Sequence, residues 1–183
     1  MKDLLLAAVL VLSSVNAHAQ SQQPYSGMQS RPLKALSEAQ IADLRAGRGM
    51  TLALAAELNG YPGPVHVIEL ADALALTPEQ RTRMQGLYQA MKAEAVPLGE
   101  QLIARESELD HAFASRNVTQ PILTVATAQI GQTQAALRAT HLRYHLLTVE
   151  LLTTDQMQTY ARLRGYAAAP DQRHDAAMHD SGR

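Results

Sequence analysis

Two histidines stand four residues apart, at His141 and His145. On a helix this spacing puts both imidazole rings on one side, where they can share a metal ion. Two ligands make a weak site, so a third ligand has to come from another segment. If the chain reverses its direction near Asn117, Glu94 lies within one helical turn of both histidines. Two imidazoles and one carboxylate would suit Zn²⁺ or Cu²⁺. The alternative is that both histidines flank a seam between helices and pack or hydrogen-bond locally.

The remaining residues show no catalytic pattern. The sequence has no cysteine, which excludes a thiol nucleophile, a thiolate metal site and a disulfide framework. It has no G-x-S-x-G elbow, no phosphate-binding glycine loop and no H-E-x-x-H string. The acidic cluster of Glu106, Glu108 and Asp110 is typical of a solvated helix face. We therefore predict that the protein is not an enzyme. Its formal net charge of -1 argues against a nucleic-acid binder.

Two strings with the pattern L-T-x-x-Q frame the longest helical stretch. In each string the threonine can act as a helix N-cap, and the glutamine can reach back to the N–H group of the cap and close a capping box. A weaker copy with serine in place of threonine begins at Leu36. These strings are therefore predicted to be helix starts with a structural role. Their residues are Leu76, Thr77 and Gln80, and Leu152, Thr153 and Gln156.

The spacing of apolar residues predicts two long helices between the strings. One helix is expected over 78–115. The other is expected over 119–151, where apolar residues recur at alternating spacings of three and four. Shorter helices are expected over 37–45, 50–58 and 65–74, and a last one after Leu152. The predicted fold class is all-α, a long antiparallel helical hairpin with short flanking helices.

The ends of the chain differ in composition from this helical part. Residues 1–19 read as a secretory signal peptide, with an apolar stretch and an A-x-A site that predicts cleavage after Ala19. Residues 20–36 are rich in Ser, Gln, Pro and Gly and are expected to be a disordered leader. The helical domain is expected over 37–166, and 167–183 is expected to be a disordered tail.

The two motifs, the long hairpin between them, the export signal and the absence of cysteine resemble the periplasmic LTxxQ-motif family of Spy- and CpxP-like envelope-stress chaperones. The resemblance covers 76–166. It implies a periplasmic all-α protein, usually a cradle-shaped homodimer, that acts as an ATP-independent chaperone or modulates envelope-stress signalling. Some metal-sensing relatives carry H-x-x-x-H near the mature N-terminus, whereas this sequence has no histidine between Ala19 and His66. The region 47–74 lies outside the resemblance, and the sequence assigns no role to it.

Residues 117–137, here called the uncharged run, contain no charged residue but many Gln and Thr. An exposed helix face usually carries Lys or Glu, so either a dimer partner covers this run or it is an adaptable surface that accepts many partners. We place Gln132 on that client-binding surface. Met84 and Met91 would add soft apolar contacts and Arg138 would attract acidic client segments. Because both methionines lie on an apolar stripe, burial in the core is the alternative for them.

The sequence thus favours a periplasmic, homodimeric chaperone that binds unfolded proteins. The alternative function is a Zn- or Cu-binding stress sensor or buffer. In that case, His141 and His145 would change the dimer or its contact with a membrane-bound sensor. No other cofactor is expected.

Overall fold

The computed structural model describes residues 23–166. The predicted signal peptide and the predicted tail lie outside the described residues. The chain divides into two units at Arg31. The described part of the first unit contains the 3₁₀ turn η1 (Met28–Ser30), in which no residue is buried. The second unit begins at Pro32, so ordered structure extends into the predicted leader: Leu33 is buried, and Lys34 Nζ lies 3.2 Å from Asp110 Oδ2.

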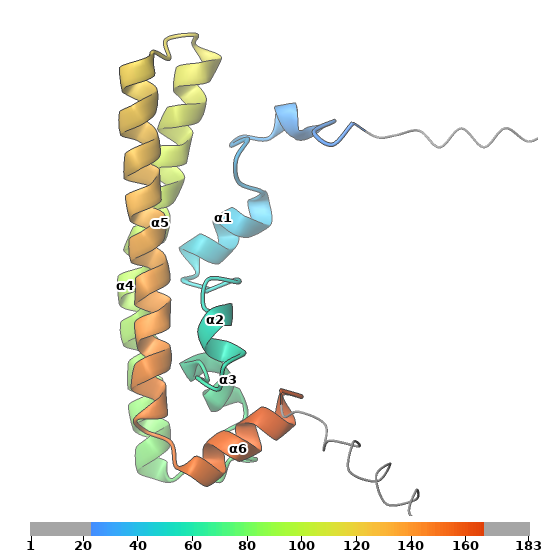
Figure 1. Ribbon diagram of the computed structural model, residues 1–183, viewed down its shortest axis with the longest axis vertical. Coiled ribbons are helices and arrows are strands. Elements are labelled where there is room, and N and C mark those ends of the chain that lie inside the picture. Colours follow the sequence, from blue (N-terminus) through green and yellow to red (C-terminus); the bar gives the residue numbers. More distant parts are fainter. Residues whose placement is uncertain (1–22, 167–183) are drawn as a thin grey trace, which may run out of the picture. The chain divides into compact units, whose positions relative to one another are not determined.

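The second unit is a helical hairpin with shorter helices beside it (Figure 1). Between residues 23 and 166 there is no strand, so the predicted all-α class is confirmed. None of the helices in this range is long and apolar enough to cross a bilayer. The helices are α1 (Glu38–Arg45), α2 (Leu54–Glu57), α3 (Pro64–Glu69), α4 (Pro78–Ala114), α5 (Gln120–Val149) and α6 (Thr154–Leu163).

The long helices α4 and α5 run antiparallel, as predicted, and the short helices lie along them. In sequence order, α1 contacts α4, α2 contacts α5, and α3 contacts both (Figure 1). Helices α2 and α3 are shorter than the predicted segments 50–58 and 65–74. At the first segment, Met50 has a positive φ of 47° and Ala53 lies outside the helical region with φ -106° and ψ 13°, so α2 begins only at Leu54. At the second segment, Leu70 leaves the helical region with φ -101° and ψ 14°, which ends α3 at Glu69.

The predicted helix starts are confirmed in detail. Capping boxes are complete at Ser37, Thr77 and Thr153, where each side-chain oxygen accepts the backbone N–H of a glutamine three residues on. Each glutamine side chain in turn accepts the N–H of its cap residue. Such caps stabilise a helix by about 0.5–2 kcal/mol. They explain why α1, α4 and α6 begin where the sequence predicts.

The structure adds a contact between the two motifs that the sequence did not suggest. The Gln80 and Gln156 side chains donate to each other, with Nε2–Oε1 distances of 2.9 and 3.0 Å. Gln80 Nε2 also donates to the Leu151 carbonyl at 2.8 Å, and Gln156 Nε2 to the Leu74 carbonyl at 3.3 Å. Each glutamine therefore caps its own helix and ties that helix to the start of the other.

We expect Gln80→Ala and Gln156→Ala to be energetically coupled. Each single variant loses the hydrogen bonds between the two glutamine side chains, and the double variant loses the same hydrogen bonds only once. The sum of the single losses should therefore exceed the loss in the double variant by about 0.5–3 kcal/mol. Urea denaturation of the wild type, the two single variants and the double variant measures this coupling. The matched control pairs Gln156→Ala with Gln40→Ala, which removes a capping box without such a contact. That pair should be additive, and additivity in both cycles would contradict the prediction.

Two apolar clusters hold the second unit together. One lies near the start of α4 and contains Met84, and the other lies farther along the hairpin. Helix α1 approaches α4 closely at Gly99, where a Cβ atom would lie 2.6 Å from the Leu44 carbonyl oxygen. The second cluster therefore depends on a glycine in the middle of α4. Its buried members are Leu44, Ala95, Leu102, Ile130 and Leu137.

Candidate functional site

The two histidines lie inside the protein, on the face of α5 that the region 47–74 covers. His141 is 2% exposed and His145 is 8% exposed. Gly49 lies on the His141 ring, since a Cβ atom there would be 3.1 Å from Nδ1. Gly63 lies on the His145 ring, since a Cβ atom there would be 2.8 Å from Cε1. The region that the sequence left without a role is therefore a layer over the hairpin, and its glycines permit this close approach.

The two imidazoles differ in their hydrogen bonding. His145 Nδ1 lies 2.6 Å from the Tyr61 carbonyl oxygen, so this nitrogen carries the hydrogen and donates it. His141 Nε2 is buried and has no hydrogen-bond partner among the described residues. Burial, and then the charge of His145, lowers the pKa of His141 below its ordinary value. His141 is therefore neutral at pH 7.

Glu94 does not lie with the histidines. Its carboxylate accepts the Tyr144 hydroxyl at 2.8 Å and pairs with Arg143. Burial and then this hydrogen bond raise the pKa of Tyr144. The prediction counted position along the helix axis but not around it, where successive residues turn by about 100°. The set of His141, His145 and Glu94 is not assembled, and residues 23–166 hold no group of three His, Cys, Asp or Glu that could hold a metal ion.

A buried polar network next to His145 centres on Glu57 of α2. The Glu57 carboxyl group accepts the Tyr160 hydroxyl of α6 and the Gly63 N–H, the latter at 3.1 Å. Its oxygens lie 3.8 Å from His145 Nδ1 and 3.7 Å from Arg164 Nε. Burial, and then the hydrogen bond to Glu57, raises the pKa of Tyr160, which keeps the phenol protonated as a donor. Sequence reasoning missed this network, although Glu57 is the only charged residue in the apolar segment 50–58.

A cavity of about 450 Å³ adjoins this network, between the covering layer and the hairpin. Two of its lining residues, Arg48 and His66, pair with acidic residues of the protein. Arg48 Nε lies 2.6 Å from Asp43 Oδ1, and His66 Nδ1 lies 2.9 Å from Glu69 Oε2. Two buried nitrogens at this cavity, His141 Nε2 and Arg164 Nε, have no hydrogen-bond partner among the described residues. The contacts of Glu57 with Tyr160, Gly63 and His145 connect α2, α5 and α6, which favours a structural role.

The predicted client-binding residues separate into two groups. Met84 is fully buried and Met91 is 5% exposed, both on the hairpin face that the short helices cover. Gln132 and Arg138 are exposed on α5. In this conformation only the two residues on α5 are accessible to another protein. The methionines have the core position that the sequence offered as their alternative.

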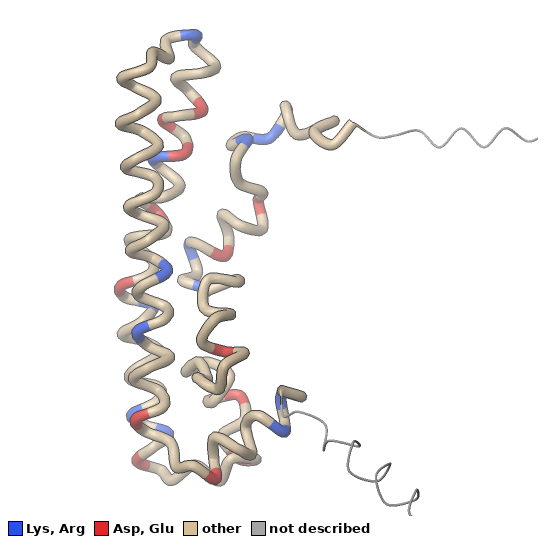
Figure 2. Tube along the Cα trace, in the orientation of Figure 1, with Lys and Arg blue, Asp and Glu red and all other residues tan. Residues whose placement is uncertain are grey.

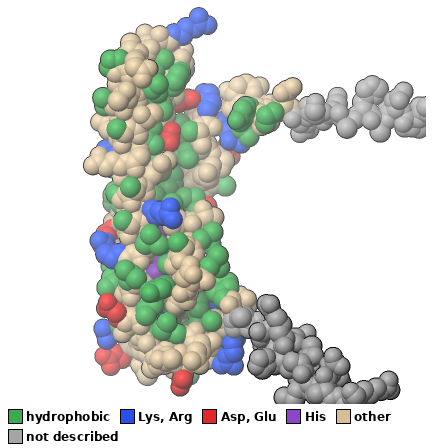
Figure 3. All heavy atoms as spheres, viewed as in Figure 1, with side chains coloured by type: hydrophobic (Ala, Val, Ile, Leu, Met, Phe, Trp, Pro, Cys, Tyr) green, Lys and Arg blue, Asp and Glu red, His purple; other side chains and the backbone are tan. Residues whose placement is uncertain are grey.

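The uncharged run covers the end of the connection between α4 and α5 and the N-terminal part of α5. Most of its side chains are exposed. Figure 2 shows this part of the helix without any acidic or basic residue. In Figure 3 the same end of the hairpin presents mostly apolar and uncharged polar side chains. Arg105 of α4 donates to the Gln129 carbonyl and to Thr133 Oγ1, which binds the two helices together.

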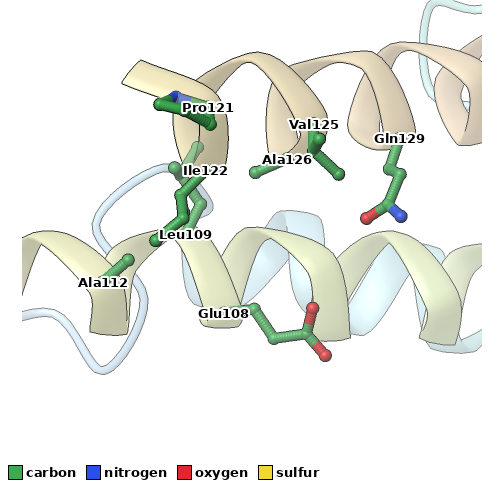
Figure 4. A pocket seen from close by; sticks show the side chains of 8 residues that line it. All are labelled: Glu108, Leu109, Ala112, Pro121, Ile122, Val125, Ala126 and Gln129. Atoms are coloured by element: carbon green, nitrogen blue, oxygen red, sulfur yellow. The ribbon is translucent and has the colours of Figure 1, made fainter. Parts of the chain in front are cut away.

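An apolar groove of about 390 Å³ lies between α4 and α5 at this end of the hairpin (Figure 4). Ile122 and Val125 are 44% and 57% exposed, and nearby Phe113 is 54% exposed. Exposed apolar surface of this kind marks interaction sites when it is contiguous. We call this feature the end groove. It is lined by Glu108, Leu109, Ala112, Pro121, Ile122, Val125, Ala126 and Gln129.

The end groove could be anticipated only in part from the sequence. The uncharged run identified its α5 side. On the α4 side, the acidic cluster of Glu106, Glu108 and Asp110 predicts a solvated face and gives no sign of a groove. The sequence therefore indicated the α5 side of a binding surface on 117–137 but not the α4 residues that complete the groove.

Comparisons of the chain with protein-family models, with curated proteins and with solved structures find no significant match.

Proposed function

We propose that the protein binds unfolded polypeptides in the periplasm without ATP and keeps them from aggregating. The observation that carries this proposal is the exposed uncharged run of α5, which ends at the apolar end groove. Unfolded chains expose apolar side chains of varied sequence. A surface without fixed charges repels neither acidic nor basic segments, and such adaptable surfaces suit binders of many partners.

The proposal includes a homodimer, as the family resemblance implies. A second copy is also the main competing occupant of the uncharged run, since a partner helix could cover it. The exposed residues Gln132, within the uncharged run, and Arg138, directly after it, are the proposed client contacts on α5. Metal binding by His141 and His145 stays a separate prediction, in which an outside ligand would have to complete the site.

An aggregation assay tests the proposed function. An unrelated enzyme is diluted from denaturant in the presence of the purified protein and a chelator, and light scattering is followed. We expect scattering to fall as the protein is added, with strong suppression at a small molar excess. An unchanged scattering curve at several-fold excess would reject the proposal. Suppression that appears only with added Zn²⁺ and is lost in His141→Ala would instead favour the metal-dependent function.

A further inference from the structure

We infer that the end groove binds client segments in which apolar side chains stand next to lysine or arginine. This inference rests on the proposed function, because it names the client chemistry that part of the same surface selects. It also goes beyond that function, since an uncharged surface alone would show no preference for either sign of charge.

The apolar lining of the groove accounts for the preference for apolar side chains. Leu109 and Ala112 of α4 face Ile122 and Val125 of α5 across it (Figure 4). Its volume of about 390 Å³ lies at the lower end of the range of ligand pockets, roughly 300–1,000 Å³. The groove therefore has room for a few side chains of a flexible segment.

Glu108 accounts for the basic part of the preference. It is the charged residue in the lining of the end groove, and it is exposed. No Lys, Arg or His among the described residues lies within salt-bridge distance of it, whereas the neighbouring Asp110 pairs with Lys34 at 3.2 Å. Arg105, the cation that precedes it in α4, donates its N–H groups to α5 instead. The end groove thus offers one carboxylate without an internal partner.

The uncharged run strengthens the selectivity of this single charge. The α5 wall of the groove carries no cation that could neutralise Glu108 and no second anion. A basic client residue next to an apolar anchor can therefore approach Glu108 while the anchor occupies the groove. An acidic residue at the same place would meet repulsion.

Two labelled peptides test the inference by fluorescence anisotropy with the full protein at low ionic strength. They share the same apolar residues, but one is flanked by lysines and the other by glutamates. We expect the lysine peptide to bind about 2–5-fold more tightly, as for exposed ion pairs, and added salt should reduce this ratio. Glu108→Gln should abolish the preference and leave the glutamate peptide bound as well or better.

A second variant tests the location of binding. Val125→Gln should weaken the binding of both peptides by about 5-fold or more, because it places a polar group on the apolar wall. The control is Leu146→Gln, which also replaces an exposed apolar side chain by glutamine, at a residue of α5 that is 53% exposed and lies outside the groove. That variant should bind both peptides like the wild type. Circular dichroism checks that all variants keep their helix content.

Several results would overturn the inference. These are equal binding of the two peptides, no binding of either, or a preference that survives in Glu108→Gln. A dimer that dissociates in Val125→Gln would make the groove a contact between copies of the chain and would equally overturn it. None of these results touches the aggregation assay, so the proposed function can survive them. Conversely, charge-selective peptide binding without suppression of aggregation would keep the groove and reject the chaperone.

Discussion

Replacement of Glu57 by alanine is expected to destabilise the protein by about 3–5 kcal/mol, the cost of breaking a buried ionic network from one side. The Tyr160 hydroxyl and the Gly63 N–H both donate to this carboxyl group and would lose their acceptor inside the protein. The Arg164 guanidinium would lose the acidic group that lies 3.7 Å from its Nε. Each of these groups would then be buried or half-buried without compensation.

Equilibrium unfolding in urea measures this loss. The matched control is Glu69→Ala in the neighbouring helix α3, which removes an exposed glutamate paired only with His66 and should change stability by no more than about 0.5 kcal/mol. If Glu57→Ala does not fold at all, the free energy of unfolding is measured for Glu57→Gln instead, because its amide oxygen can still accept one of the two hydrogen bonds. Its loss should lie between those of the other two variants. Equal stability of Glu57→Ala and Glu69→Ala would show that the network contributes nothing.

Replacement of Met84 by alanine is expected to destabilise the protein by about 2–5 kcal/mol. Met84 is fully buried in the cluster near the start of α4, where truncation removes apolar contacts and leaves a void. The surrounding side chains come from α3, α6 and the segment before α4, so they cannot all move inward at once. The same experiment separates the two interpretations of this residue, since a client contact on the surface would have little influence on stability.

The control for Met84 is Met50→Ala, which truncates the same side chain at a position that is 42% exposed. This variant should stay within about 0.5 kcal/mol of the wild type. Both variants should suppress client aggregation equally well at a temperature where both are folded. A folded Met84→Ala protein of normal stability that has lost its chaperone activity would reverse our placement of this residue.

Features that depend on local sequence were predictable. Capping chemistry involves residues within one turn, so the starts of α4 and α6 followed directly from Thr77 and Thr153. The ends of the long helices followed from apolar spacing and from the polar connection near Asn117. The region 47–74 was harder, because its first turn depends on Met50 and the turn directly after it on Ala75, and both have positive φ values that these residue types rarely adopt.

Features that depend on rotation around a helix or on distant segments were not predictable. The register of a hairpin puts Glu94 level with the histidines along the helix axis. Only the packing of α5 shows that the Glu94 carboxylate contacts Arg143 and Tyr144 instead. Glu57 carried no sign of a partner, because Tyr160 is far away in the sequence. The contact between Gln80 and Gln156 was hidden for a similar reason, since each glutamine already had a sufficient local explanation.

The contact between these two glutamines has a consequence for the order of folding. It closes a loop with a sequence separation of 76 residues, whereas the connection between α4 and α5 brings neighbouring residues together. Short loops close at a lower entropic cost than long ones, so the hairpin should form from its connection and reach the motifs last. A contact absent from the folding transition state acts mainly on the rate of unfolding. The paired motifs would thus determine how long the native protein lasts rather than how fast it forms.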